Sequence, residues 1–150
     1  MYVYQALRRP KENSKIEGPR IIREVRYDHL SEEHVITKLK KSTQDIPGTW
    51  RIYRSVNKRD MVKAKLEFIE TLTRQLVLPA SVSNKNPESL WKDILMQPRN
   101  KAERLFLLDI DTKDQVVIDI AKGSVEVLEE KETVNGYHII CTPFNPNLIR

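Results

Sequence analysis

The order of hydrophobic and polar residues predicts strands and helices that alternate along the chain. Side chains that alternate with a period of two indicate strands, and apolar residues spaced three and four apart indicate helices. Strands are expected at residues 3–7, 20–27, 49–56, 105–111, 125–133 and 137–142, and helices at 32–41, 58–78, 87–97 and 113–122.

Local signals place the ends of these elements. Ser31, Asn57, Asn86 and Thr112 precede the helices and have side chains that can accept hydrogen bonds from a first helical turn. The sequence at 134–136, Val-Asn-Gly, is the strongest hairpin signal in the chain. In the second helix, which Pro79 is expected to end, the residues that recur with a helical period are Val62, Leu66, Ile69, Thr73 and Leu76, with Lys63, Lys65 and Glu67 facing away from them.

This order of elements predicts an α+β fold, with a mainly antiparallel sheet that carries helices on one face. The other face of the sheet would be open to a ligand. The 150 residues suit a single domain, 1–150, with a helical insertion at about 58–100.

Composition narrows the class of protein. No apolar run approaches the roughly 18 residues of a membrane span, and the first residues lack the pattern of a signal peptide. A cytoplasmic protein without membrane contact is therefore expected. Cys141 is the only cysteine, which excludes an internal disulfide and a cysteine-based zinc site.

The net charge of +5 is unevenly distributed along the chain. Residues 1–60 contain 14 Lys and Arg against 8 Asp and Glu, whereas residues 101–150 contain 6 against 9. This distribution suits a protein that holds polyphosphate with its basic first part and a metal with its acidic last part. Many small basic proteins, however, have such a charge without any nucleic-acid partner.

Two aspartates one residue apart, Asp109 and Asp111, close the hydrophobic strand at 105–111. The period of two places both carboxylates on one face of the strand. Because hard cations prefer oxygen ligands, this pair predicts a site for Mg²⁺ or Mn²⁺ against a phosphate. The alternative is that the acids merely end the strand and cap the next helix.

His138 follows the expected Asn-Gly turn, on a strand expected to neighbour the acidic one. An imidazole there can bond a triphosphate or transfer a proton near neutral pH. A structural role is the alternative for a lone histidine in a strand.

The strand at 49–56 has two distinct faces. Trp50, Ile52 and Val56 form an apolar face that Arg54 interrupts. Phosphate donors beside a stackable aromatic ring are typical of a site for a nucleotide or for single-stranded nucleic acid. A half-exposed strand with solvated arginines is the alternative. The residues predicted to bind such a ligand are those of the other face and just beyond it, together with Arg54: Arg51, Tyr53, Arg54, Ser55, Asn57, Lys58 and Arg59.

Three motifs in order, Ser55-Val56-Asn57, Asp109-Ile110-Asp111 and Gly136-Tyr137-His138, resemble the archaeo-eukaryotic primase superfamily, in particular its primase-polymerase branch. The resemblance spans residues 49–142. It implies an RRM-like fold and the activity of a metal-dependent nucleotidyltransferase. It also implies that Asp109 and Asp111 hold a divalent metal and that His138 contacts the phosphates of an incoming nucleoside triphosphate.

Two other functions stay open beside nucleotide processing. A non-catalytic module that binds nucleic acid or a nucleotide is favoured because the family has a third acidic motif after the histidine, and residues 141–150 contain no Asp or Glu. A small interaction protein, such as a viral inhibitor with a protein partner, is the other. The chain lacks the motifs of P-loop enzymes, zinc proteases and serine hydrolases, which argues against those classes.

Overall fold

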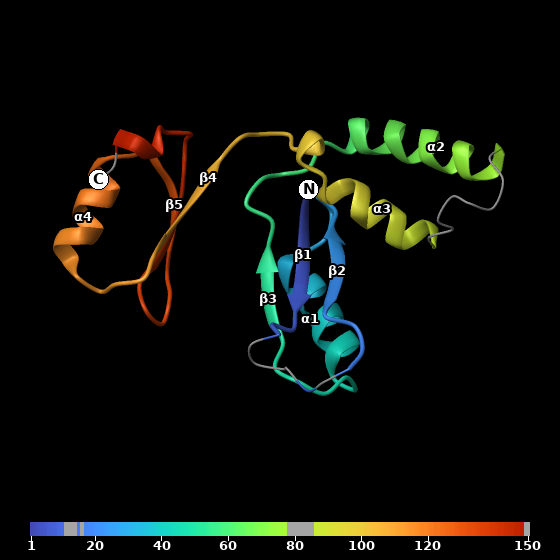
Figure 1. Cartoon of the computed structure of the whole chain (residues 1–150), viewed down its shortest axis with the longest axis horizontal. Helices are drawn as coiled ribbons and strands as arrows, with labels where there is room; N and C mark the ends of the chain where they lie inside the picture. The colour runs from blue at the N-terminus through green and yellow to red at the C-terminus, as the bar shows by residue number, and fades with distance from the viewer. Residues whose placement is uncertain (11–14, 16, 78–85, 149–150) are drawn as a thin grey trace. The chain divides into compact units, whose positions relative to one another are not determined.

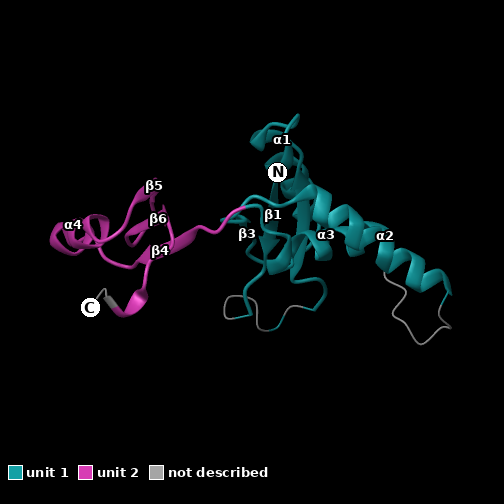
Figure 2. Ribbon diagram, turned by 90° about the horizontal axis from the view of Figure 1, so that it is seen from above, with its two compact units in different colours: residues 1–102 teal, residues 103–150 magenta. Residues whose placement is uncertain are grey.

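The computed structural model describes residues 1–10, 15, 17–77 and 86–148. The chain divides into two compact units, Met1–Ala102 and Glu103–Arg150 (Figure 2). Each unit contains one three-stranded antiparallel sheet. The predicted α+β class is confirmed, and these elements are compatible with an RRM-like fold. The expected single domain stays a prediction.

Unit 1 is built around a sheet in which β1 is the central strand (Figure 1). Its strand order is β2-β1-β3, and both pairings are antiparallel. The expected insertion at about 58–100 forms α2, α3 and a short 3-10 helix, η1. The elements are β1 (Tyr2–Leu7), β2 (Ile21–Arg26), α1 (Glu32–Thr43), β3 (Arg51–Arg54), α2 (Met61–Val77), α3 (Pro87–Met96) and η1 (Pro98–Asn100).

Alternate residues of β1 belong to two different apolar clusters. Tyr4 and Ala6 pack with Val35 and Leu39 of α1. Val3, which points to the opposite side, packs with residues of α2 and α3. Helix α1 therefore covers one face of the sheet. Helix α3 covers the opposite face at the end where Val3 lies.

Two of the four expected helix caps, Ser31 and Asn86, are present. The side chain of Ser31 accepts from the backbone N–H of His34, and that of Asn86 accepts from Glu88. Asn57, expected to cap α2, is instead buried. The chain continues past it, and Asp60 accepts from the first backbone N–H groups of α2. Pro79 lies outside the described residues.

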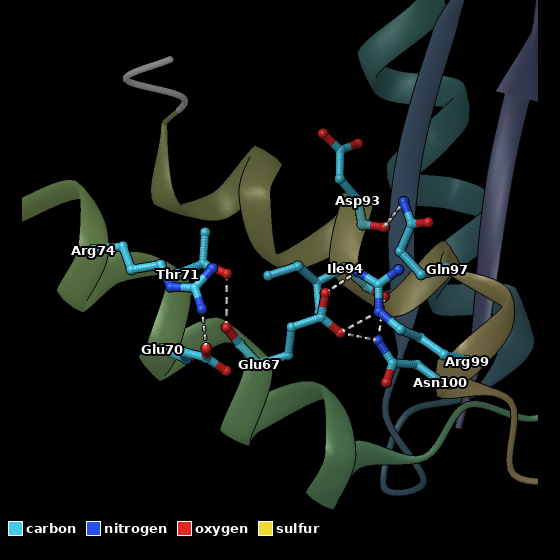
Figure 3. A network of polar contacts seen from close by, with 9 residues as sticks. All are labelled: Glu67, Glu70, Thr71, Arg74, Asp93, Ile94, Gln97, Arg99 and Asn100. Carbon is cyan, nitrogen blue, oxygen red and sulfur yellow. Dashed lines mark hydrogen bonds and ion pairs between the residues drawn. The ribbon is translucent and has the colours of Figure 1, made fainter. Parts of the chain in front are cut away.

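Helix α2 is fixed to η1 by a polar network centred on Glu67 (Figure 3). Its carboxylate accepts from the guanidinium of Arg99 and, at 2.8 Å, from Nδ2 of Asn100. The same amide donates at 2.7 Å to the backbone oxygen of Ile94 in α3. These bonds join α2, α3 and η1, and they hold the pKa of the Glu67 carboxyl below its usual range, chiefly through the bond from Arg99.

Unit 2 has the predicted order strand, helix, strand, strand, and its sheet order is β4-β6-β5. Helix α4 covers one face, where Ile110, Ile118, Ile139 and Cys141 form the core. Burial raises the pKa of the Cys141 thiol, as expected for a cysteine that packs. The elements are β4 (Phe106–Ile110), α4 (Gln115–Gly123), β5 (Val127–Glu132), β6 (Tyr137–Cys141) and the 3-10 helix η2 (Pro146–Leu148).

In unit 2 the predicted cap of α4 needs correction, and the predicted hairpin is confirmed. Asp114 caps α4 by accepting from the N–H of Val116, whereas Thr112 accepts from the N–H of Asp114. The turn at 134–136 joins the antiparallel strands β5 and β6, and Gly136 does not adopt a positive φ there. Glycine is needed there because a Cβ would overlap the backbone carbonyl of Ile110.

Candidate functional site

Asp109 and His138 face each other directly across β4 and β6. Nε2 of His138 lies 3.3 Å from Oδ1 of Asp109, a distance that gives an ion pair when the imidazole is protonated. Both side chains are partly exposed, on the face of the sheet that α4 does not cover, because their neighbours Ile110 and Ile139 point into the core. The histidine is therefore close to the acidic strand, as the sequence predicted.

Lys131 extends this pair into a row across all three strands. It is the register partner of His138 on β5, so Asp109, His138 and Lys131 lie side by side on the uncovered face. Lys131 belongs to no motif that points to a site in the sequence. Pairing the two strands outward from the 133–136 turn, with Glu132 opposite Tyr137, would have found it.

Asp111 lies just beyond the end of β4 and is exposed. Among the described residues, no three His, Cys, Asp or Glu side chains come close enough together to hold a metal ion. Mg²⁺ is commonly bound by one or two carboxylates together with substrate phosphates. Two aspartates therefore fit a metal that arrives with a nucleotide better than a metal held by the protein alone, and metal binding stays a prediction.

Strand β3 has the orientation that its sequence predicts. Trp50 and Ile52 pack against the cluster beneath α1, and Nε1 of Trp50 donates to the backbone oxygen of Ile46 at 3.2 Å. Arg51 and Tyr53 point to the other side and are exposed. Because β3 is an edge strand, a ligand can approach both residues from the side as well as from the face.

The neighbours of Arg51 and Tyr53 form a partly open surface, called here the β3 platform. Its residues lie in two rows across the sheet, opposite the face that α1 covers. The ion pair of Arg23 with Asp93 of α3, at 2.9 Å, bounds the platform on the β2 side. The β3 platform consists of Arg51, Tyr53, Gln5, Leu7 and Ile21.

Arg54 and Ser55, also predicted to bind a ligand, have structural contacts instead. The guanidinium of Arg54 lies 4.6 Å from the ring centre of Tyr2, on the side that α1 covers. Ser55 accepts from the N–H of Val3 at 3.2 Å and donates to the backbone oxygen of Asn57 at 3.1 Å. These contacts continue the edge of the sheet after β3 has ended.

Asn57 and Arg59 are buried, and Lys58 between them is exposed. The backbone explains this alternation. The backbone N–H of Arg59 donates to the oxygen of Met1, and Arg59 forms an isolated antiparallel β-bridge with Lys101, so this segment is held within unit 1. Of the predicted phosphate and base contacts, Arg51, Tyr53 and Lys58 therefore remain at the surface.

Arg59 is unusual among the buried residues. Only 7% of it is exposed, and within the described part of the chain its Nε and Nη1 have no hydrogen-bond partner. Burial lowers the pKa of its guanidinium. Unpaired donors in such a place reduce stability.

A separate groove in unit 1 lies between α2, α3 and the turn after β2. Its volume is about 810 Å³ and its lining is mainly apolar and aromatic. Trp91 Nε1 donates to the hydroxyl of Tyr27 at 3.1 Å, and Phe68 packs edge-on against Trp91. No local sequence pattern predicts this groove, because its aromatic residues come from three distant segments.

No protein-family model, curated protein or solved structure matches this chain. The resemblance to the primase superfamily therefore depends on the three short motifs alone, and it stays a prediction. In the structure their residues belong to both units: Ser55 and Asn57 to unit 1, Asp109, Asp111 and His138 to unit 2. Within the described residues, no helix has the length and apolar character needed to cross a membrane.

Proposed function

We propose that the chain is a binding module that holds single-stranded nucleic acid or a nucleotide on the β3 platform. The observation that carries this proposal is the two-sided character of β3. Trp50 and Ile52 are held in the core, and Arg51 and Tyr53 are presented on the exposed side. An arginine beside an aromatic ring can contact a phosphate and stack on a base at the same time.

Charge supports the same surface. Residues 1–60, which contain β3, have 14 Lys and Arg against 8 Asp and Glu. Lys58 adds an exposed cation just beyond the strand. A basic surface attracts a phosphate chain from a distance and increases the rate of association.

The test is fluorescence anisotropy with labelled single-stranded DNA and RNA over a range of salt concentrations. Arg51→Ala should weaken binding to all sequences alike and reduce the slope of log K against log salt by about 0.7, the value for one phosphate contact on a single strand. Lys41→Ala is the matched control, because it removes one exposed positive charge from α1 of the same unit. Equal effects of the two substitutions would refute a specific platform and leave only net charge.

The second candidate function is metal-dependent nucleotide processing in unit 2. The observation that favours it is the position of His138 opposite Asp109 on the uncovered face, with Asp111 on the same side of the strand. A divalent ion bound with a nucleotide would polarise a phosphoryl oxygen. The carboxylates of Asp109 and Asp111 would hold that ion, and His138 and Lys131 would donate to phosphate oxygens. The catalytic activity is tested by nucleotide incorporation on a primed template with the Asp109→Asn variant as the control.

A further inference from the structure

Helix α2 has a second apolar face that no other described residue of unit 1 buries. The side chains of Val62, Leu66, Ile69 and Leu76 are between 60% and 87% exposed. Apolar patches of this kind on a protein surface usually mark a site of interaction. The residues that define this face, called here the α2 seam, are Val62, Leu66, Ile69, Thr73 and Leu76.

The side of α2 that packs on unit 1 is a different one. Ala64 is fully buried, Phe68 and Leu72 pack in the same cluster, and Glu67 is bonded to η1 (Figure 3). With about 100° of rotation per residue, the centre of the α2 seam lies about 120° around the helix from Phe68, so the two apolar sides are distinct. Unit 1 thus holds α2 as a formed helix and leaves the seam exposed.

The spacing along the seam is four, three, four and three residues. This is the a/d repeat of a coiled coil, in which each side chain packs between four residues of a second helix. Two heptads are too few for an isolated helix, because forming the helix itself is costly. That limit does not apply here, since the contacts with α3 and η1 already keep α2 helical.

We infer that the α2 seam joins two copies of this chain in an antiparallel dimer. Charge complementarity identifies the partner. With Val62, Ile69 and Leu76 at d, Lys63 and Glu70 each follow a d position, so they lie along the same edge of the seam with opposite charges. Glu70 also pairs with Arg74 on its own helix at 2.6 Å, and its second carboxylate oxygen can accept from a lysine of the partner copy. An antiparallel second copy brings Lys63 of each chain close to Glu70 of the other, which gives the two-fold symmetric contact of a dimer.

Analytical ultracentrifugation of the full chain tests this inference. The wild type should pass from monomer to dimer between about 1 and 500 µM, a range suited to a small interface. Leu66→Glu should stay monomeric over this range, because it places a charge in the seam. Val116→Glu on α4 is the matched control, since Val116 and Leu66 are both 65% exposed, and it should dimerise like the wild type.

A wild type that is monomeric at the highest concentration would overturn the inference, and so would a Leu66→Glu variant that dimerises. Loss of the dimer in Val116→Glu would place the contact on α4 and would also overturn it. Circular dichroism of each variant verifies that the fold is retained.

Charge reversal tests the antiparallel direction. Lys63→Glu and Glu70→Lys should each weaken the dimer by roughly threefold to tenfold, and the double exchange should restore it. A parallel dimer would instead pair Glu70 with Lys65, on the other edge of the seam. If Lys65→Glu weakens the dimer and Lys63→Glu does not, the antiparallel arrangement is wrong.

Discussion

His138 Nε2 and Asp109 Oδ1 lie 3.3 Å apart on neighbouring strands, on the exposed face of the sheet in unit 2. A protonated imidazole at this distance occupies one oxygen of the carboxylate. A metal ion that binds Asp109 must therefore compete with the histidine. Nucleotide phosphates would supply further oxygen ligands and would also accept hydrogen bonds from His138.

The first prediction is that Mn²⁺ binds unit 2 only together with a nucleoside triphosphate. Calorimetric titration of the full chain should give a binding heat with nucleotide present and little without it. Asp109→Asn with Asp111→Asn should abolish that heat. Asp119→Asn on the exposed side of α4 serves as the control and should leave it unchanged. Identical heats for the wild type and the double variant would exclude the aspartate pair as ligands.

The second prediction separates the two faces of β3. Tyr53→Ala should cost roughly 1–3 kcal/mol of binding free energy for single-stranded nucleic acid, because it removes a stacking surface. Trp50→Ala should cost roughly 3 kcal/mol of unfolding free energy, because it removes a ring packed against the α1 cluster. Anisotropy and urea unfolding measure the two quantities. If Tyr53→Ala changes only stability, the β3 platform is not a binding surface.

The third prediction concerns the buried guanidinium of Arg59. Replacing it with methionine should leave stability unchanged or increase it by about 1 kcal/mol, because the substitution removes donors that have no partner among the described residues. Both tryptophans of the chain, Trp50 and Trp91, lie in unit 1, so their fluorescence in urea reports on the unfolding of this unit. A loss of more than about 2 kcal/mol would mean that the guanidinium has a stabilising partner.

The fourth prediction is an acid-dependent loss of stability in unit 1. The hydrogen bond from Arg99 holds the pKa of Glu67 below its ordinary value of 4.5 in the folded protein. The resulting stabilisation is present above that ordinary value and is lost as the pH falls toward the folded-state pKa. Glu67→Gln should therefore show a smaller change in the urea midpoint than the wild type between about pH 5 and pH 3. The same pH dependence in both proteins would assign the effect to other carboxylates.

Local features of this fold could be predicted from sequence because their partners lie a few residues away. The Ser31 and Asn86 caps are examples, since each bonds to an N–H two or three residues further on. The alternation of Trp50 to Tyr53 also gave the correct faces of β3, because the apolar side of a strand has to be buried.

Helix α2 marks the limit of such reasoning. Its sequence contains two apolar stripes, and the α2 seam has the more regular spacing, yet the structure buries the side with Ala64 and Phe68. Periodicity shows that a helix has an apolar face, but it does not show which neighbouring element will cover that face. Here the choice depends on α3 and η1, which lie far from α2 in the sequence. Asn100 of η1 donates both to Glu67 of α2 and to the backbone oxygen of Ile94 in α3.

The candidate sites divide in the same way. The strand that ends in Asp109 and Asp111, the histidine after the turn and the exposed pair Arg51 and Tyr53 follow from local sequence, because each depends on the period of one strand. The contact of His138 with Asp109 and the burial of Arg59 arise only when distant segments come together. Those outcomes depend on which strands pair and on how the chain folds back toward Met1, and such long-range contacts leave no local pattern in the sequence.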